Sequence, residues 1–399
     1  MKKSILAISL VALILGVSEG ETFASIKAEK IDTAPEDRNT GLMKRIRDGK
    51  KDKPQTEPLY FKKAKWMTSV DFLWWQSNAG ALKLMTHAGG SLDAGGGSTI
   101  GFSLDASIVN LKYRWDPGFR VGVARFFDGL DGWDCFFNGT YFYGTGVGHA
   151  NIAAALTISP DTIDFSLPSK TNWHLNYYTF DLELGRNFFF YKKVQLRPHF
   201  GFRGAIINQN VNTTLGPLTT ILNTTGSPIE VSATSKSSNH FSGFGIRGGG
   251  RLIWELTKNI GLLGQLSGTA ILGEFDLATN MEANANLSIA SVAGISAQAV
   301  VKADDAYFKL RSNLEGLAGL YFKIPMHKKK HLLEMIVGYE TAIWFKQNEL
   351  NNFTNSISST ATSVAAIAGA TLPSTGSTNV APSSHLALRG LTFNMRYSF

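Results

Sequence analysis

The chain of 399 residues has a single cysteine, Cys135, so it cannot form a disulfide bond within itself. Charged residues are also scarce, because their share of 18% lies below the roughly 25% of soluble domains. Glycine, with 40 residues, and phenylalanine, with 26, are abundant instead. Abundant glycine and aromatic residues without long apolar runs are typical of β-barrels rather than of helical membrane proteins.

Long hydrophobic runs are missing after the N-terminus, which argues against transmembrane helices in the mature chain. The early apolar stretch Ile5–Val17 follows two lysines and is shorter than the roughly 20 residues of a spanning helix. This pattern predicts a signal peptide over residues 1–24, cleaved after Ala24, with cleavage after Gly20 as the alternative. A short buried core helix is the other interpretation of this stretch. We therefore expect an exported protein, either soluble or a barrel.

Motifs for nucleic acid binding are also absent, although the net charge is +8, because the basic residues are scattered along the chain. We predict no nucleic acid partner. Residues 25–65 are mostly charged and polar, and we predict a polar periplasmic segment there with at most one short helix at Gly41–Arg47.

From Trp66 onward the dominant period is two, and residues 66–399 are predicted to form one β-barrel domain. In the segment 178–184, for example, Tyr178, Phe180 and Leu182 alternate with polar residues. A soluble sandwich would alternate in the same way. Aromatic residues near the strand ends favour a membrane barrel instead, because aromatic girdles mark both membrane interfaces. These residues are Trp66, Trp74, Trp75, Trp115, Trp133, Trp173, Phe188, Phe189, Phe190, Trp254 and Trp344.

Short and long connections alternate along this region, as the periplasmic turns and outer loops of outer-membrane barrels do. The segment Asp116–Gly118 is predicted as a short outer turn, 81–88 as a strand, and 89–100 as a glycine-rich periplasmic link. This predicts a transmembrane antiparallel outer-membrane β-barrel of about 12 strands, with 10 to 14 possible. The short periplasmic turns are expected at 128–131, 191–193, 257–259 and 324–330, and the long outer loops at 144–171, 208–239, 275–303 and 348–384.

The C-terminal stretch LTFNMRYSF alternates without a break and ends on Phe399. We expect a strand that closes the barrel by pairing with the first strand, so that it has no free end to fray. Tyr397 and Phe399 resemble the C-terminal signal that the barrel assembly machinery reads. The lipid side is expected to carry Leu391, Phe393, Met395, Tyr397 and Phe399, and the lumen side Thr392, Asn394, Arg396 and Ser398.

Several stretches resemble the Legionella-type major outer membrane protein family, which also occurs in environmental relatives of chlamydiae. The resemblance implies an outer-membrane β-barrel with porin activity or with a structural and surface role. Some proteins of this kind are cross-linked through many cysteines, which a chain with Cys135 alone does not support. The blocks that carry the resemblance are DFLWWQ (71–76), YRWDPGFRVGV (113–123), DGWDCFFNGTYF (131–142), NYYTFDLELGRNFF (176–189), LRPHFGFRGAIINQ (196–209) and GLTFNMRYSF (390–399).

Motifs of enzymes and cofactor sites have simpler explanations here. The glycines of 243–250 precede a strand-like segment rather than the helix that a dinucleotide site needs. The two histidines of HKKKH (327–331) lie among lysines in a predicted turn, which disfavours a metal. No nucleophile elbow is present. Asp181 and Glu183 could form a catalytic pair but are better explained as lumen charges. We therefore expect no enzyme, no cofactor and no metal site.

The polar face of the strands is the most informative set of residues. Charges of both signs around a lumen would select solutes by charge. Basic residues slightly outnumber acidic ones, which suggests a mild anion preference. A plugged lumen, in which the same charges form static pairs, is the alternative. By strand parity the predicted pore-lining residues are Lys112, Arg114, Arg120, Asp181, Glu183, Arg197, Arg203, Arg247, Arg251, Lys309, Arg311 and Glu315, and parity also turns Asp71, Glu255, Glu334, Glu340 and Arg396 inward.

These observations predict a porin in the outer membrane of a Gram-negative bacterium, through which small hydrophilic solutes and ions diffuse passively. The alternative is a structural or adhesive surface protein that acts through its outer loops and has a narrow or plugged lumen. The expected partners are outer-membrane lipid and the barrel assembly machinery. A homo-oligomer and host surface molecules are further candidate partners.

Overall fold

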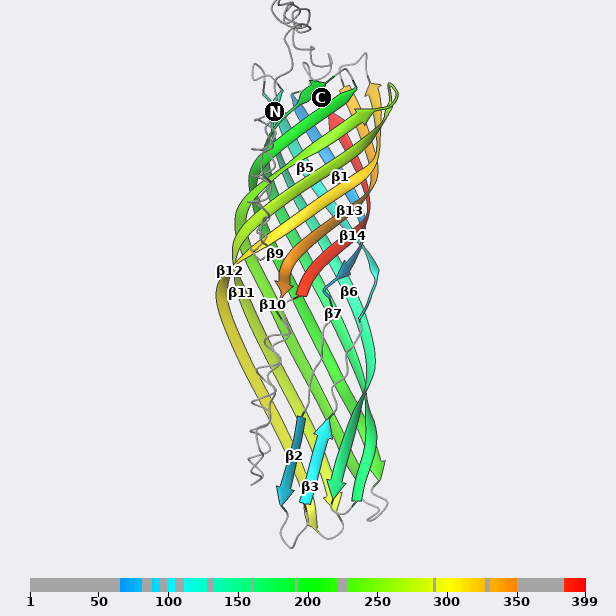
Figure 1. Cartoon of the computed structure of the whole chain (residues 1–399), viewed down its shortest axis with the longest axis vertical. Helices are drawn as coiled ribbons and strands as arrows, with labels where there is room; N and C mark the ends of the chain where they lie inside the picture. The colour runs from blue at the N-terminus through cyan, green and yellow to red at the C-terminus, as the bar shows by residue number, and fades with distance from the viewer. Residues whose placement is uncertain are drawn as a thin grey trace, which may run out of the picture.

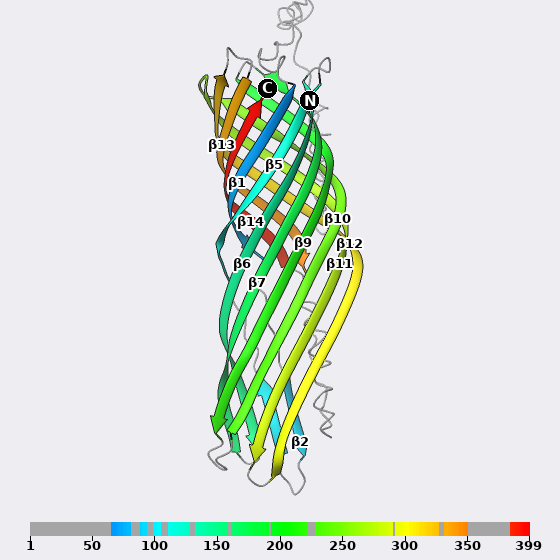
Figure 2. The same cartoon turned by 180° about the vertical axis from the view of Figure 1, so that it is seen from behind.

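The computed structural model describes residues 65–80, 88–93, 99–104, 111–127, 132–158, 161–190, 193–221, 228–289, 292–326, 331–349 and 384–399. Ten antiparallel strands pair around a closed ring, which is the barrel (Figures 1 and 2). In ring order they are β1 (Trp66–Asn78), β5 (Trp115–Phe126), β6 (Trp133–Ile158), β7 (Asp161–Arg186), β9 (Val194–Ile221), β10 (Pro228–Glu255), β11 (Ile260–Ile289), β12 (Val292–Met326), β13 (His331–Asn348) and β14 (Ser384–Ser398).

In the described part of the chain, four shorter strands lie outside the ring. β2 (Ala88–Asp93) and β3 (Thr99–Leu104) form a hairpin, and β3 pairs with the far end of β6. β4 (Lys112–Tyr113) also pairs with β6, and β8 (Phe188–Phe190) pairs with β9. Among the described residues, no helix is long and apolar enough to cross a membrane.

The ring closes between β1 and β14, as the alternation at the C-terminus predicts. Their register runs from Met67 opposite Ser398 to Asn78 opposite Ala387. Beyond it, the Phe399 amide donates to the Trp66 carbonyl at 2.9 Å, and the Trp66 amide donates back at 3.0 Å. The backbone groups of both end strands are therefore paired, and no sheet edge faces the lipid at this seam.

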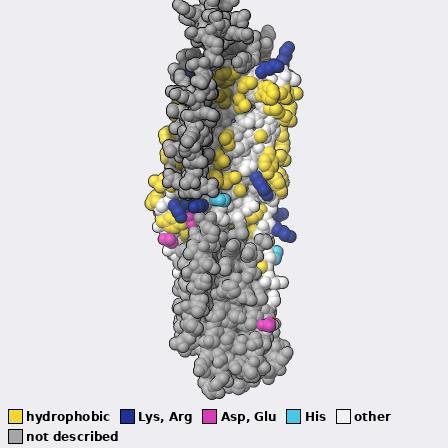
Figure 3. Space-filling view, viewed as in Figure 1, with side chains coloured by type: hydrophobic (Ala, Val, Ile, Leu, Met, Phe, Trp, Pro, Cys, Tyr) yellow, Lys and Arg dark blue, Asp and Glu magenta, His cyan; other side chains and the backbone are white. Residues whose placement is uncertain are grey.

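The side-chain pattern is that of a membrane barrel, apolar outside and polar or packed inside. On β14, Phe393 is 41% exposed, whereas the neighbouring Thr392 is fully buried. On β1, Trp66 and Trp74 face outward eight residues apart, close to the roughly 9 to 11 residues that one membrane strand needs. Figure 3 shows hydrophobic side chains spread over the barrel on the face in view. The predicted lipid and lumen faces of residues 391–399 are confirmed.

Six strands are far longer than a membrane requires. β6, β7, β9, β10, β11 and β12 have 26 to 35 residues, whereas β1, β5, β13 and β14 have 12 to 18. The long strands continue past the ring as an extension of the sheet, with the β2–β3 hairpin near its far end (Figures 1 and 2). This extension, defined as the parts of β6, β7, β9, β10, β11 and β12 beyond the ring together with β2 and β3, lies at the end opposite Phe399.

The extension corrects three predicted loops. Residues 144–171, 208–239 and 275–303 are mostly strand, since β6 runs to Ile158 and β7 begins at Asp161, with similar short gaps after Ile221 and Ile289. Their small Ser, Thr, Ala and Asn side chains give a weak hydrophobic period, but their backbones still pair across long registers. The fourth predicted loop, 348–384, lies almost wholly outside the described residues.

The N-terminal strand assignment also needs correction. Asp116–Gly118 is not a turn but belongs to β5, near the start of a strand, where a proline is tolerated. The predicted link at 89–100 overlaps the β2–β3 hairpin. The barrel therefore has ten strands, the lower end of the expected range. The predicted turn at 257–259 is confirmed between β10 and β11. The signal peptide, residues 25–64 and most of the predicted strand 81–88 lie outside the described residues.

Two glycines of β9 allow a matched test of packing in the wall. A Cβ on Gly201 would lie 1.9 Å from the Leu182 carbonyl oxygen, whereas a Cβ on Gly204 would meet nothing within 4 Å. We expect Gly201→Ala to destabilise the barrel by about 1 to 3 kcal/mol through overpacking, and Gly204→Ala to leave it unchanged. Urea unfolding in detergent measures the stability of both variants, with the folded fraction taken from the heat-dependent gel mobility. Equal stability of the two variants would contradict the close approach of β7 and β9.

Candidate functional site

The barrel interior is the candidate site, and its side chains form three layers. The order of residues along the strands gives the order of the layers. On β7, Trp173 and Tyr177 precede Asp181 and Glu183 on the way to the short turns. The aromatic layer contains Trp75, Phe142, Trp173, Tyr177, Phe241, Phe275 and Trp344, the charged layer contains Asp71, Arg120, Asp134, Asp181, Glu183, Arg197, Arg203, Arg247, Glu315 and Glu340, and a small apolar layer near the short turns contains Ile253, Leu263, Tyr321 and Ile336.

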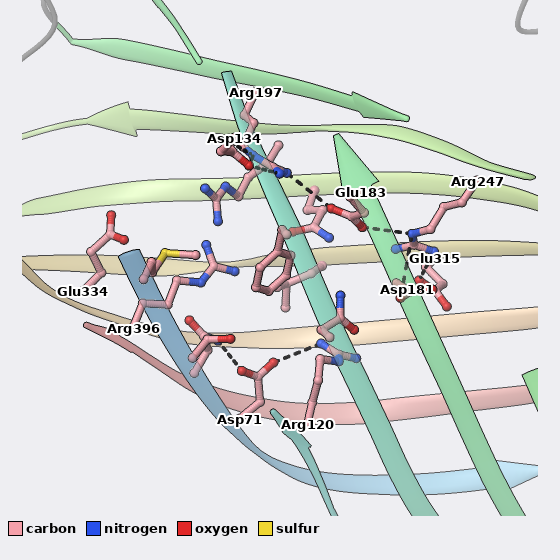
Figure 4. Close-up of a pocket in the computed structure, with 18 of the residues that line it drawn as sticks. Asp71, Arg120, Asp134, Asp181, Glu183, Arg197, Arg247, Glu315, Glu334 and Arg396 are labelled. Atoms are coloured by element: carbon pink, nitrogen blue, oxygen red, sulfur yellow. Dashed lines mark hydrogen bonds and ion pairs between the residues drawn. The ribbon is translucent and has the colours of Figure 1, made fainter. Parts of the chain in front are cut away.

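A continuous chain of ion pairs forms most of the charged layer. The guanidinium group of Arg203 donates to both oxygens of Asp181 at 2.5 and 2.7 Å and also pairs with Glu315. Arg247 joins Glu315, at 2.7 Å, to Glu183, at 3.1 Å. The chain continues along neighbouring strands to β6, because Arg197 of β9 pairs with Glu183 of β7 at 3.3 Å and with Asp134 of β6 at 2.5 Å (Figure 4).

A second, separate group surrounds Arg120 of β5. Its guanidinium donates to Asp71 of β1 at 3.0 Å and to Glu340 of β13 at 2.8 Å. Thr392 of β14 donates to Glu340 at 2.8 Å, and Asn394 donates to Asp71. The group therefore ties β5 to the seam between β1 and β14.

Pairing explains how so many charges remain buried. An unpaired buried charge is costly, and removing one partner of a buried pair typically costs about 3 to 5 kcal/mol. Arg120, Arg197, Arg203 and Arg247 each bridge two carboxylates, a use to which the fixed fork of a guanidinium group is suited. The charged layer is therefore a cross-linked structure rather than a row of independent charges.

The cavity beside these groups is small. Its volume is about 60 Å³, whereas one water needs roughly 10 to 15 Å³. Six arginines and seven carboxylates line it, so the lining has no net positive charge. The arginines are Arg120, Arg197, Arg203, Arg247, Arg251 and Arg396, and the carboxylates are Asp71, Asp134, Asp181, Glu183, Glu315, Glu334 and Glu340.

Eight of the twelve predicted pore-lining residues lie around this cavity: Arg120, Asp181, Glu183, Arg197, Arg203, Arg247, Arg251 and Glu315. The additional inward residues Asp71, Glu334, Glu340 and Arg396 join them. Glu255 instead pairs with Lys323.

The other four predicted residues lie elsewhere. Arg311 is buried but pairs with Glu349, and Lys309, half-exposed, reaches the same carboxylate at 3.0 Å. Lys112 and Arg114 are exposed. Between them Tyr113 packs edge-on against buried Trp173, with 5.2 Å between ring centroids. Because neighbours on a strand point to opposite sides, both basic residues point away from that layer, contrary to the parity assignment.

The aromatic layer is the part of the site that the sequence pattern does not predict. The sequence pattern predicts interfacial girdle positions for Trp75, Trp173 and Trp344, yet all three are buried inside the barrel at 2% exposure or less. Parity could have found two of them, because Trp74 and Trp75 cannot both face lipid and Trp173 shares the inward parity of Asp181. Asp134, the partner of Arg197, was also missed.

No group of three or more histidine, cysteine or acidic side chains arranged to hold a metal occurs among the described residues. In the charged layer the carboxylates are already engaged by arginines. The arrangement is therefore suited to holding the strands together.

A family comparison decides what kind of barrel this is. Residues 60–399 match the family model described as the Legionella pneumophila major outer membrane protein precursor. The chain belongs to this family. Membership confirms the resemblance carried by the sequence blocks and identifies a protein of the bacterial outer membrane. Outer-membrane barrels make their short excursions between membrane strands on the periplasmic side and their long ones on the outer side, which places the extension on the outer side.

Comparisons outside the family add little. No curated protein matches the chain. Among solved structures, the outer membrane protease OmpT from Escherichia coli is 9% identical, with a TM-score of 0.30, over 84% of this chain and 97% of that one. The outer membrane protein OprG from Pseudomonas aeruginosa is 11% identical, with a TM-score of 0.21, over 64% and 95%. Likenesses this low carry no argument about activity.

The ion-pair chain predicts that the stability of the barrel depends strongly on Arg203. Replacing it with methionine leaves Asp181 and Glu315 short of a partner, and we expect a loss of about 3 to 5 kcal/mol in the free energy of unfolding. Arg389→Met on the exposed face of β14 is the control and should cost little. Equilibrium urea unfolding in detergent micelles measures both variants. Similar losses in both would mean that the buried pairs do not hold the wall together.

Proposed function

We propose that this protein is a structural surface protein whose barrel has a closed lumen and holds the extension outside the membrane. Two features support this proposal: aromatic and ionic contacts across the lumen, and strands that continue well beyond the membrane. The protein would act through its outer part, on other surface molecules or on a host surface.

Contact between opposite walls is the observation that carries the proposal. β7 and β13 are five strands apart in either direction around the ring of ten. The indole nitrogen of Trp344 on β13 nevertheless donates to the hydroxyl of Tyr177 on β7 at 3.4 Å, and the two rings meet edge-on. Phe241 on β10 packs against the same tryptophan. These side chains therefore meet across the lumen.

The charged layer forms a second barrier beneath the aromatic one. A solute that passes it must separate buried ion pairs, such as Arg203–Glu315 and Arg120–Glu340. The cavity volume of about 60 Å³ is enough for a few waters, and it lies well below the roughly 300 to 1,000 Å³ of small-molecule pockets. Ten strands also lie near the small end of barrels, where side chains fill the interior.

The extension supports a role outside the membrane. β12 continues through residues 292–312 before it meets β13, and β11 pairs with it over most of that length. The β2–β3 hairpin widens the same sheet at β6. Backbone pairing of this extent holds a surface well away from the lipid.

A porin for small hydrophilic solutes is the second candidate. Charges of both signs around a cavity in the barrel favour it, since such linings select solutes by charge. Under this candidate the aromatic layer acts as a gate that must open. The balanced lining gives no support to an anion preference, so reversal potentials in a salt gradient should lie near zero.

Single-channel recording in planar bilayers tests the closed lumen. We expect no stepwise conductance from the wild type and openings from Tyr177→Ala/Trp344→Ala, because the double substitution removes the contact across the lumen. Phe393→Ala, on the lipid side of β14, is the control and should remain silent. Stepwise ohmic openings of the wild type would overturn the proposal in favour of the porin. Silence of a folded double variant would mean that the charged layer alone closes the barrel.

Shortening the outer sheet tests the surface role. In the β6–β7 register Gly148 pairs with Thr171, so residues 149–170 can be replaced by a two-residue Asn-Gly turn without shifting the barrel register. We expect a barrel with wild-type heat-dependent gel mobility and markedly reduced adhesion of expressing cells to host cells. Undiminished adhesion would exclude this part of the extension as the contact surface.

A further inference from the structure

We propose that the cavity binds a single small inorganic anion, held by Arg251 of β10 and Arg396 of β14. This proposal is independent of whether the lumen conducts. The six arginines that line the cavity fall into two groups.

Four of these arginines have their charge matched locally. Arg120, Arg197, Arg203 and Arg247 each contact at least two carboxylates at ion-pair distance. Arg251 and Arg396 differ, because no described carboxylate lies within 4.0 Å of either guanidinium group. The Nε atom of each is buried and has no hydrogen-bond partner.

Arg396 is the more informative of the two. Only 9% of it is exposed, and it reaches into the cavity beside Glu334 (Figure 4). Glu334 lies directly opposite Arg396 in the β13–β14 register. Its carboxylate instead accepts a hydrogen bond from the hydroxyl of Tyr321 at 2.5 Å. A buried guanidinium without a partner is costly, which favours a bound counter-ion.

Arg251 has a second positive group near it. Its charged neighbours are Arg197, Glu334 and Asp134, and Arg197 already donates to Asp134. A negative ion beside Arg251 would offset its repulsion from Arg197. The volume of about 60 Å³ is enough for one small ion with a few waters.

The chemistry of the lining indicates the class of ligand. Guanidinium groups present paired N–H donors that match the oxygens of sulfate or phosphate, and they also attract halides. The cavity is too small for an organic anion of metabolite size. The ligand is therefore a free inorganic oxyanion or a halide.

Long-range charge balance is the alternative explanation for Arg251 and Arg396. The paired network contains four arginines and six carboxylates, Asp71, Asp134, Asp181, Glu183, Glu315 and Glu340. Arg251 and Arg396 could simply balance this excess at longer range. In that case the site holds only water, and the stability of the barrel does not depend on the identity of the anion in solution.

Anion-dependent stability of the purified, folded protein tests the two explanations. The midpoint of heat-induced loss of the folded gel band is measured in sodium sulfate, sodium bromide and sodium gluconate at equal ionic strength. We expect a saturable rise with sulfate or bromide and none with the bulky gluconate. Saturation with sulfate identifies an oxyanion site, and saturation with bromide alone identifies a halide site. No saturable rise with either ion would overturn the proposal.

Substitutions then locate the ion. Arg251→Gln and Arg396→Gln should abolish the saturable rise, whereas Arg389→Gln, on the exposed face of the same strand as Arg396, should retain it. A full response in both cavity variants would place the ion elsewhere and overturn the assignment. If neither variant folds, wild-type crystals soaked in bromide or in selenate, which replaces sulfate, decide, because an anomalous peak from one of the two ions must appear in the cavity lined by Arg251 and Arg396.

Discussion

Backbone pairing between β1 and β14 is the interaction on which the other features depend. In a bilayer every N–H and C=O of a strand must find a partner, so a sheet can span it only when it closes on itself. The two-way bonds between Trp66 and Phe399 complete that closure. Once the ring is closed, the alternation of side chains assigns each residue of the wall to lipid or lumen.

Closure at ten strands also determines what the lumen can contain. Opposite walls of so small a ring are within reach of two aromatic side chains, as Tyr177 and Trp344 demonstrate. Arginine, with its long side chain and forked donors, bridges walls that shorter residues could not. The interior therefore behaves as a packed core with polar and apolar layers, and its arginine–carboxylate pairs are comparable to those of buried ionic networks in soluble proteins.

Much of this architecture could be predicted from the sequence, because lipid imposes a simple rule on alternating strands. The seam at β14 and eight of the twelve inward charges follow from parity alone. Lys112 and Arg114 did not, because β4 and β5 are separate strands and the parity counted from one does not carry over to the other. Trp173 and Trp344 were misplaced because composition near strand ends was given more weight than parity. The long outer strands escaped notice because small polar side chains carry little hydrophobic signal even when their backbones pair.

The unequal lengths of the strands have a consequence for how the molecule meets its neighbours. Four adjacent strands, β13, β14, β1 and β5, are short, and the long strands follow one another around the rest of the ring. The wall outside the membrane is therefore high on one side and low on the other over the residues that the structure describes. An adjacent molecule therefore meets a different surface on each side of the barrel. The outer part of the protein is not rotationally symmetric about the barrel axis.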